Sequence, residues 1–297
     1  MVGGAPPRCI RVSAQRILIT GSAGLVGTGL LASRPPDAEV VAGIHRAAVD
    51  DRSTAGPVET VRVDLTDPDA VDAVVADVAP DLVLHAAYDK TRSGVVDASA
   101  NVAAACQATD AAVIHLSSDV VFDGRADQNS EGDRPDPVSE YGTWKLEAEG
   151  AVRARVPDAA IVRTSLVASA DPPDHVMRWL AEAVSEGREV VLFDDEIRAP
   201  ILLADLASAI WAIAELPRAD RGGVWHLVGP EALSRLAHGR IELGWLGRSD
   251  APVTVGSAAD LADPRPRRLV LTCERAEREL SFAPRSLGTV SAHGPSS

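Results

Sequence analysis

Short apolar runs of the kind that form buried strands alternate along the chain with stretches whose apolar residues recur at helical spacing. Residues 17–19, Ile-Leu-Ile, form the clearest such run, and apolar positions at helical spacing follow it at Leu25, Val26, Leu30 and Leu31. Further strands are predicted over residues 39–43, 58–63, 81–85 and 112–116, and helices over residues 95–108 and from Tyr141 onward. This alternation predicts an α/β fold with a doubly wound parallel sheet, in which ligands bind at the carboxyl ends of the strands.

Three glycines, Gly21, Gly24 and Gly27, join the first predicted strand to the first predicted helix. Gly21 permits a tight turn with positive φ, and Gly24 lets the backbone approach a pyrophosphate beside the free N–H groups of the helix N-terminus. A turn that needs glycine only for packing is the alternative, but the position between a strand and a helix favours a dinucleotide site. The residues expected to contact the phosphates are Gly21, Ser22, Ala23, Gly24, Leu25, Val26 and Gly27.

Composition and charge narrow the class of protein. The chain has 297 residues, of which 46% are hydrophobic, enough for a large domain with a second lobe, and its net charge of −14 argues against nucleic-acid binding. Three scattered cysteines, Cys9, Cys106 and Cys273, are typical of reduced thiols in a cytoplasmic protein and predict neither a disulfide framework nor a metal site. No apolar run reaches the length of a membrane span, so we expect no membrane partner.

The ends of the second, third and fourth predicted strands carry candidate cofactor contacts. No carboxylate follows the second strand, whereas Arg46 does, and a guanidinium suits the 2′-phosphate of NADPH better than the 2′-hydroxyl of NADH. The alternative for Arg46 is an ordinary solvated arginine on the surface. Asp64 follows the third predicted strand and is a candidate contact for the adenine, although a plain turn at the end of that strand explains it almost as well. After the fourth strand, Ala86 and Ala87 are small enough for a cofactor to lie against the backbone.

A serine, a tyrosine and a lysine are spaced for carbonyl chemistry. Ser118 and Asp119 follow the fifth strand, and Tyr141 and Lys145 are four residues apart, so these two share one face of the predicted helix. A tyrosine has an ordinary pKa of about 10, and a nearby ammonium lowers that pKa by stabilising the phenolate. We therefore expect Tyr141 to exchange protons, Ser118 to hold the substrate carbonyl, and Lys145 to hold the cofactor ribose as well. The alternative is an exposed helix with a capping tyrosine.

Four sequence blocks together resemble the extended short-chain dehydrogenases/reductases, and within them the dTDP-4-dehydrorhamnose reductase branch. The blocks are Thr20-Gly21-x-x-Gly24-x-x-Gly27, Ser117-Ser118-Asp119-Val120-Val121-Phe122-Asp123-Gly124, Tyr141-Gly142-x-x-Lys145 and Val162-Arg163-Thr164-Ser165. The resemblance covers about residues 17–287 and implies a Rossmann-type nucleotide domain with a smaller C-terminal substrate lobe. It also implies a catalytic set of Ser118, Tyr141 and Lys145, which in this family reduces a nucleotide-linked 4-keto-6-deoxysugar with NADPH or NADH.

The resemblance also completes the expected binding sites. Beyond the phosphate turn, the expected cofactor contacts are Arg46, Asp64, Leu65, Ala86, Ala87, Tyr88, Asn101, Ser117, Tyr141, Lys145, Arg163, Thr164 and Ser165. The expected substrate contacts are Ser118, Asp119, Val120 and Arg198. A guanidinium such as that of Arg198 is well suited to a nucleotide diphosphate, and an ordinary surface salt bridge is the alternative.

The expected domain boundaries follow from the same comparison. Residues 14–165 are expected to form the NAD(P)-binding domain, to which residues 196–227 return. Residues 166–195 and 228–290 are expected to form the substrate lobe, and residues 1–13 and 288–297 to be flexible tails.

The chain departs from the branch at a few positions, and three functions remain open. His85 stands where the family usually has asparagine, and residues 88–94 match the family poorly. The first function is an NADPH-dependent 4-ketoreductase of a nucleotide-linked, typically dTDP-linked, deoxysugar in antibiotic or cell-surface sugar biosynthesis. The second is a nucleotide-sugar epimerase with tightly bound NAD, against which Arg46 argues. The third is a non-catalytic NADP-binding regulatory protein, against which the intact Ser-Tyr-Lys set argues. A homodimer is also left open.

Overall fold

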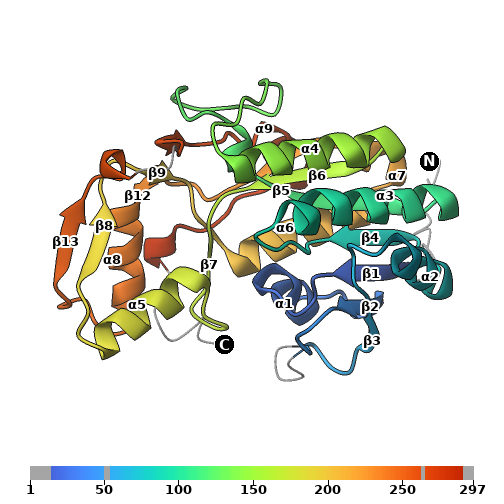
Figure 1. Cartoon of the computed structure of the whole chain (residues 1–297), viewed down its shortest axis with the longest axis horizontal. Helices are drawn as coiled ribbons and strands as arrows, with labels where there is room; N and C mark the ends of the chain where they lie inside the picture. Colours follow the sequence, from blue (N-terminus) through green and yellow to red (C-terminus); the bar gives the residue numbers. More distant parts are fainter. Residues whose placement is uncertain (1–14, 50–53, 262–264, 290–297) are drawn as a thin grey trace, which may run out of the picture.

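A seven-stranded parallel sheet forms the centre of the molecule (Figure 1). The computed structural model describes residues 15–49, 54–261 and 265–289, so the expected tail over residues 1–13 lies outside the described residues. The sheet has the order β3-β2-β1-β4-β5-β6-β11, which confirms the predicted doubly wound arrangement. The strands are β1 Arg16–Thr20, β2 Glu39–Ile44, β3 Glu59–Arg62, β4 Leu82–His85, β5 Ala112–Ser118, β6 Ala160–Thr164 and β11 Gly223–Leu227. The strand order reverses between β1 and β4, where such sheets bind ligands.

Helices cover both faces of this sheet because successive strand residues point to opposite sides. Ile17 and Ile19 belong to a buried core shared with α1 and α6, whereas Leu18 belongs to the core shared with α2, α3 and α4. The indole N–H of Trp211 in α6 donates to the carbonyl of Leu30 in α1 over 3.1 Å, which fixes the two helices together. The helices are α1 Leu25–Ala32, α2 Pro68–Val78, α3 Ala98–Thr109, α4 Glu140–Arg155 and α6 Leu203–Glu215.

The helix N-termini near the carboxyl edge of the sheet differ in how they are capped. Asp67 caps α2 by accepting hydrogen bonds from the N–H groups of Asp69 and Ala70. Ser139 caps α4 by accepting a hydrogen bond from the N–H of Gly142. The N-cap of α1 is Gly24, which has no side chain to satisfy the first N–H groups of that helix. Those groups therefore remain available to an anion.

A second lobe lies beside the sheet and consists of α5 His175–Ser185, β8 Val190–Phe193, α8 Arg235–Trp245 and β13 Val253–Gly256. β13 pairs in parallel with β8, and the four elements share a core that includes Leu180, Leu192 and Leu243. Short strands connect this lobe to the sheet. β9 Ile197–Arg198 lies between β12 Leu233–Ser234 and β14 Arg268–Leu269, and β7 Val167–Ala168 pairs with β10 Ile201–Leu202.

The structure differs from the sequence prediction at several boundaries. The helix expected over residues 95–108 begins with a π-helical turn, η2 Ser93–Asp97, before α3. Two further short helices are α7 Arg218–Arg221 and α9 Glu274–Leu280. Residues 288 and 289, expected in the C-terminal tail, belong to the short helix η5 Leu287–Thr289, which is anchored because Leu287 is only 1% exposed. Residues 290–297 lie outside the described part of the chain.

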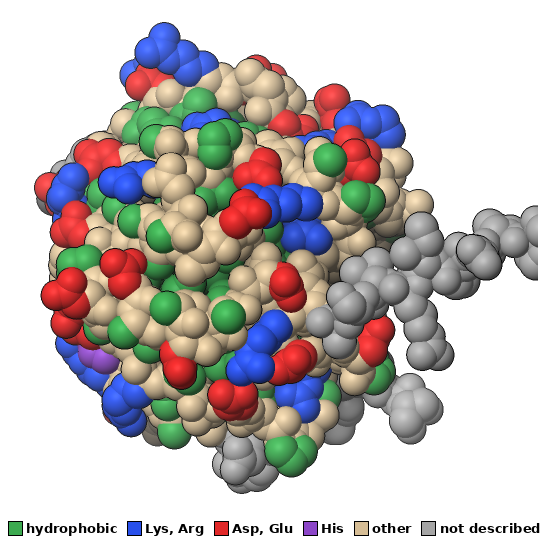
Figure 2. All heavy atoms as spheres, turned by 90° about the vertical axis from the view of Figure 1, so that its right-hand side faces the viewer, with side chains coloured by type: hydrophobic (Ala, Val, Ile, Leu, Met, Phe, Trp, Pro, Cys, Tyr) green, Lys and Arg blue, Asp and Glu red, His purple; other side chains and the backbone are tan. Residues whose placement is uncertain are grey.

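Charged side chains of both signs are mixed over the face that Figure 2 shows, and acidic groups lie beside basic ones without gathering into one patch. The excess of acidic residues therefore forms no large negative field on this face. No helix within the described residues is long and apolar enough to cross a membrane.

Candidate active site

The glycine turn after β1 has the geometry of a phosphate cradle. Gly21 has φ +74°, and a Cβ atom on it would lie 2.6 Å from the Cα atom of Ala87. A Cβ atom on Gly27 would lie 2.3 Å from the carbonyl oxygen of Gly21. Both distances are too short for any side chain, so these positions require glycine. Because the turn leads into the uncapped N-terminus of α1, the residues present fit the diphosphate of a dinucleotide.

The loops after β2 and β3 lie side by side at one end of this cradle. Arg46 is exposed, and Arg62 donates to the backbone carbonyl of His45, so Arg62 supports the loop that carries Arg46. Asp64 accepts hydrogen bonds from the N–H and hydroxyl of Thr66, which lower the pKa of its carboxyl group. The amide of Asn101 donates to the carbonyl of Leu65 over 3.0 Å. Asn101 therefore positions the loop after β3 and does not offer that N–H to a ligand.

Four residues expected to contact the cofactor point their side chains into the protein. Ser22 is fully buried and donates to the carbonyl of Ile19, and Thr164 donates to the carbonyl of Leu227. The side chains of Ser117 and Arg163 both bind another buried residue, Glu149. Local and cross-strand partners already satisfy these four side chains, so a cofactor contact at these residues would have to come from the backbone. The hydroxyl of Ser165, by contrast, is buried without a hydrogen-bond partner.

Glu149, which the sequence pattern did not single out, is a buried carboxylate that joins three elements of the site. Its carboxylate accepts from Arg163 Nε at 2.9 Å, from Arg163 Nη2 at 2.8 Å and from Ser117 Oγ at 2.6 Å, and its side chain is fully buried. These contacts tie α4 to β5 and β6 one helical turn after Lys145. The available signal was the spacing of four between Lys145 and Glu149, which places the two on one helix face.

Tyr141 and Lys145 come together in the first turns of α4, against β5, the strand that ends at Ser118. The hydroxyl of Ser118 donates to Asp119 Oδ1 over 3.2 Å. Lys145 is only 5% exposed, its Nζ donates to the carbonyl of Leu116 over 3.1 Å, and Nζ lies 5.9 Å from the ring centre of Tyr141. α4 approaches so closely that a Cβ atom on Gly142 would lie 2.3 Å from the carbonyl oxygen of Val120. The Lys145 nitrogen is thus held between β5 and the ring of Tyr141.

Tyr88 lies over the same pair and is 61% exposed. Its ring centre lies 6.2 Å from that of Tyr141, and Lys145 Nζ lies 5.3 Å from it. Tyr88 was expected among the cofactor contacts, and the structure places it where a ligand over Lys145 would touch it.

The pKa values of the tyrosine and the lysine differ from the expectation drawn from the sequence. Burial, followed by Tyr88 and the carboxylate of Asp119, raises the pKa of Tyr141 above its ordinary value, whereas the sequence predicted a lowered value. Burial lowers the pKa of Lys145 to about 8, an effect that Glu149 opposes. The prediction failed because it counted the ammonium and not the burial of the phenol. Tyr141 is therefore a protonated phenol at neutral pH, which is the state that a proton donor needs.

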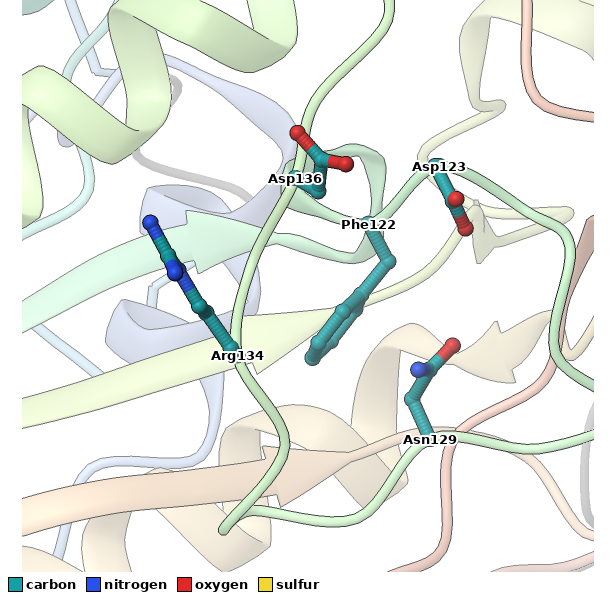
Figure 3. Close-up of a pocket in the computed structure, with 5 residues that line it drawn as sticks. All are labelled: Phe122, Asp123, Asn129, Arg134 and Asp136. Carbon is teal, nitrogen blue, oxygen red and sulfur yellow. The ribbon is translucent and has the colours of Figure 1, made fainter.

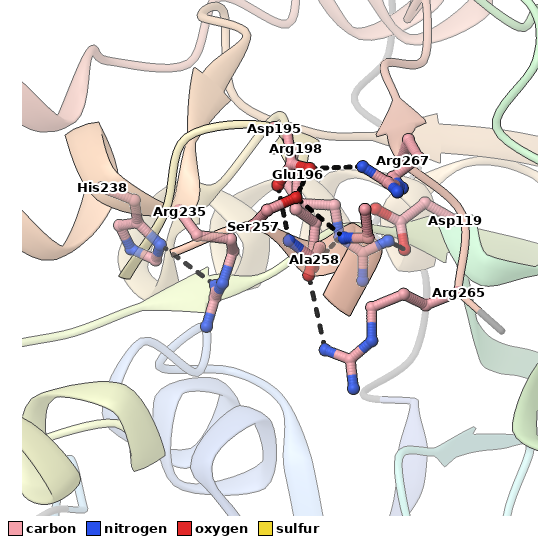
Figure 4. Close-up of polar contacts among 11 residues, drawn as sticks. Asp119, Asp195, Glu196, Arg198, Arg235, His238, Ser257, Ala258, Arg265 and Arg267 are labelled. Atoms are coloured by element: carbon pink, nitrogen blue, oxygen red, sulfur yellow. Dashed lines mark hydrogen bonds and ion pairs between the residues drawn. The ribbon is translucent and has the colours of Figure 1, made fainter. Parts of the chain in front are cut away.

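Arginines and carboxylates cluster where the second lobe meets the sheet, and one of these arginines, Arg198, lacks hydrogen bonds (Figure 4). Arg198 Nη1 lies 3.5 Å from Asp119 Oδ1, and Arg198 Nε lies 4.0 Å from Glu196 Oε1. Both nitrogens are buried and lack a hydrogen-bond partner, as does Asp119 Oδ2. Arg265 approaches Glu196 at 3.4 Å. Val120, expected to touch the substrate, is 9% exposed, and its side chain belongs to the core.

A polar cavity of about 430 Å³ opens beside the residues that follow the catalytic serine (Figure 3). Phe122, Asp123, Asn129, Arg134 and Asp136 line it, and a neighbouring hollow of about 370 Å³ shares Asp123 and reaches Arg265 and Arg267. In the described part of the chain, no group of three or more His, Cys, Asp or Glu side chains could hold a metal ion.

The doubly wound sheet, the glycine turn and the Ser-Tyr-Lys set define an extended short-chain dehydrogenase/reductase. Residues 15–289 match the family described as the RmlD substrate binding domain, and the chain belongs to this family. The probable low-salt glycan biosynthesis reductase Agl14 of Haloferax volcanii is 32% identical, over 88% of this chain and 91% of the relative. The dTDP-4-dehydrorhamnose reductase of Mycolicibacterium smegmatis is 31% identical, over 89% of this chain and 80% of the relative. The crystal structure of dTDP-4-dehydrorhamnose reductase from Bacillus anthracis in complex with NADP aligns with a TM-score of 0.79 at 21% identity, covering 93% of this chain and 96% of that one.

Proposed function

We propose that this protein is an NADPH-dependent reductase of the 4-keto group of a nucleotide-linked deoxysugar. The observation that carries the proposal is the placement of the buried Lys145 nitrogen between the ring of Tyr141 and β5, the strand that ends at Ser118. Relatives named as a glycan biosynthesis reductase and as dTDP-4-dehydrorhamnose reductases support the same reaction type. The exposed Arg46 at the end of β2 favours NADPH, while NADH stays a usable second cofactor.

The chemistry follows from the charges that the reaction creates. The nicotinamide, when bound, supplies hydride to the carbonyl carbon. Negative charge then builds on the carbonyl oxygen, where the Ser118 hydroxyl donates a hydrogen bond and Tyr141 donates its proton. The phenolate that remains on Tyr141 is stabilised by the ammonium of Lys145, whose nitrogen lies 5.9 Å from the ring centre.

The substrate lobe offers the charge that a nucleotide sugar requires. Arg198 has two buried nitrogens without hydrogen-bond partners and only loose contacts with Asp119 and Glu196. A diphosphate that accepted these hydrogen bonds would complete the guanidinium, and Asp119 could accept from a sugar hydroxyl through its unpartnered oxygen. This arrangement supports a substrate with both an anionic linker and free hydroxyl groups.

The test is NADPH oxidation by the purified protein against a panel of dTDP- and UDP-linked 4-keto-6-deoxysugars. The proposal predicts oxidation that depends on one or more of these sugars and that exceeds the rate with NADH. Interconversion of sugars without net NADPH oxidation would instead favour the epimerase. NADPH binding without turnover of any sugar would favour the non-catalytic regulatory protein.

A further inference from the structure

Two histidines are buried side by side beneath the loops expected to bind the cofactor. His85 is the last residue of β4, and His115 lies within β5. His85 and His115 are each 1% exposed, and their rings are stacked with centres 5.3 Å apart. Burial, together with the ammonium of Lys145, lowers the pKa of His85 to about 3, and His115 is also shifted well below its ordinary value. Both rings are therefore neutral at physiological pH.

His85 is the centre of a buried chain of hydrogen bonds. Its Nδ1 lies 2.7 Å from the hydroxyl oxygen of Thr20, and its Nε2 lies 3.0 Å from the hydroxyl oxygen of Ser99. Ser99 in turn donates to the carbonyl of Val95 over 2.6 Å. The chain therefore links the end of β1, the end of β4 and the junction of η2 with α3.

The donor directions in this chain fix the tautomer of His85. The single hydroxyl hydrogen of Ser99 is used on the carbonyl of Val95, so the Ser99 oxygen accepts from His85. His85 must then carry its hydrogen on Nε2, which leaves Nδ1 as the acceptor for the hydroxyl of Thr20. The link from Thr20 to His85 thus depends on one tautomer.

The two residues joined by this link each lead directly into a cofactor loop. Thr20 is followed by Gly21 of the phosphate turn, and His85 is followed by Ala86 and Ala87. These loops touch so closely that a Cβ atom on Gly21 would lie 2.6 Å from Ala87 Cα. A small shift between the ends of β1 and β4 would therefore change the shape of the cradle.

We propose that His85, as the neutral Nε2–H tautomer, is a positioning residue that sets cofactor affinity by holding Thr20 and hence the phosphate turn. The proposal rests on the proposed function only in taking NADPH as the ligand. His115 offers a matched control, because its ring is equally buried and stacks on His85 but neither of its nitrogens has a hydrogen-bond partner.

Two substitutions separate the links of His85. The amide of His85→Asn can occupy the place of Nδ1 and keep the Thr20 link, whereas the longer amide of His85→Gln can reach Ser99 and lose Thr20. Each variant gives up one buried hydrogen bond, so we expect similar falls in thermal midpoint. NADPH affinity, titrated by fluorescence, should fall roughly 5–10-fold in His85→Gln, about what one lost hydrogen bond costs, and less than about 3-fold in His85→Asn and His115→Phe.

A role in folding alone predicts a different pattern. In that case, NADPH affinity would follow the thermal midpoint, and His85→Asn and His85→Gln would bind equally well, which would overturn the proposal. Thr20→Val removes the same link from the other side, so its loss of affinity should match that of His85→Gln. The double variant should lose no more than either single variant, because both remove one interaction. Full additivity of the two losses would also count against the proposal.

The tautomer can be measured without any ligand or turnover. Long-range ¹H–¹⁵N correlation spectra of the intact protein should show His85 with its hydrogen on Nε2, identified by the signals lost in His85→Asn. A hydrogen on Nδ1 would overturn the proposed link. Wild-type protein that binds NADPH but turns over no sugar would count against the proposed function alone, since neither the tautomer nor the affinity pattern depends on turnover.

Discussion

The cofactor side and the substrate side of the site bury charged groups in opposite ways. Near the carboxyl edge of the sheet, Arg163 donates two hydrogen bonds to Glu149 in a bidentate ion pair, from Nε over 2.9 Å and from Nη2 over 2.8 Å. Ser117 donates a third hydrogen bond to the same carboxylate. In the junction with the second lobe, Arg198 lies 3.5 Å from Asp119 and 4.0 Å from Glu196 and has two nitrogens without hydrogen-bond partners.

This difference indicates which side is more nearly complete before ligands bind. The Arg163–Glu149 pair and Ser117 hold their elements in one geometry through three hydrogen bonds and leave one nitrogen, Arg163 Nη1, without a partner. Arg198 has two buried nitrogens without partners, and each carries a desolvation penalty. Helix α4 is thus fixed against the sheet in advance. If the protein binds the nucleotide sugar proposed above, its diphosphate would supply the hydrogen bonds that Arg198 lacks.

The largest effect should come from the chemistry on the fixed side. Tyr141→Phe keeps the ring but removes the proton donor, so turnover of the sugar found in the panel should fall by about 10²–10⁴-fold. NADPH affinity should stay nearly unchanged because the glycine turn and Lys145 remain. Tyr88→Phe is the matched control, since Tyr88 is the other tyrosine of the chain and lies 6.2 Å away. Single-turnover NADPH oxidation measures both; wild-type rates for Tyr141→Phe would mean that the proton comes from another group.

Replacing an arginine by methionine should lower the free energy of unfolding much more on the cofactor side than near the second lobe. Arg163→Met leaves the buried Glu149 carboxylate unpaired and should lower the free energy of unfolding by about 3–5 kcal/mol. Arg265→Met removes a side chain that is 41% exposed and should change it by less than about 1 kcal/mol. Urea unfolding of both variants provides the measurement. Equal losses of unfolding free energy in the two variants would remove the contrast between the Arg163–Glu149 pair and the arginines near the second lobe.

The buried lysine predicts a pH dependence of stability. Its folded pKa of about 8 lies below the ordinary 10.5, so between these values the unfolded chain holds the proton and the folded protein does not. Stability from this group therefore rises with pH through that window, and the penalty of burying the ammonium is fully present below it. The free energy of unfolding of Lys145→Met should exceed that of the wild type most at pH 7. This difference should be about 2–3 kcal/mol smaller at pH 10. A difference that does not vary with pH would show that Lys145 is not desolvated.

The smallest effect concerns the outer end of the cofactor site. Arg46→Ala should weaken NADPH binding by about 1.5–3 kcal/mol, the range for a hydrogen bond to a charged group, and should hardly change NADH binding. Arg62→Ala tests whether support of the Arg46 loop contributes, because Arg62 donates to the carbonyl of His45. Titration of both cofactors decides the matter, and equal losses for NADPH and NADH in Arg46→Ala would refute a 2′-phosphate contact.

Much of the fold and the centre of the site could be predicted from the sequence because both depend on neighbours along the chain. The alternation of apolar runs and helical spacing determined the parallel sheet, and Gly21 and Gly27 determined the turn, since any side chain there would collide with backbone. The spacing of four between Tyr141 and Lys145 placed both on one face of α4.

Only the tertiary structure decided the burial and the hydrogen-bond partners of those side chains. The direction of the Tyr141 pKa shift depends on burial, and the inward turn of Ser117 and Arg163 depends on Glu149, whose carboxylate lies between strands and helix only after folding. The link from Thr20 to His85 joins residues 65 positions apart. Desolvation and long-range hydrogen bonds are properties of packing, so no local pattern of residues could have determined them.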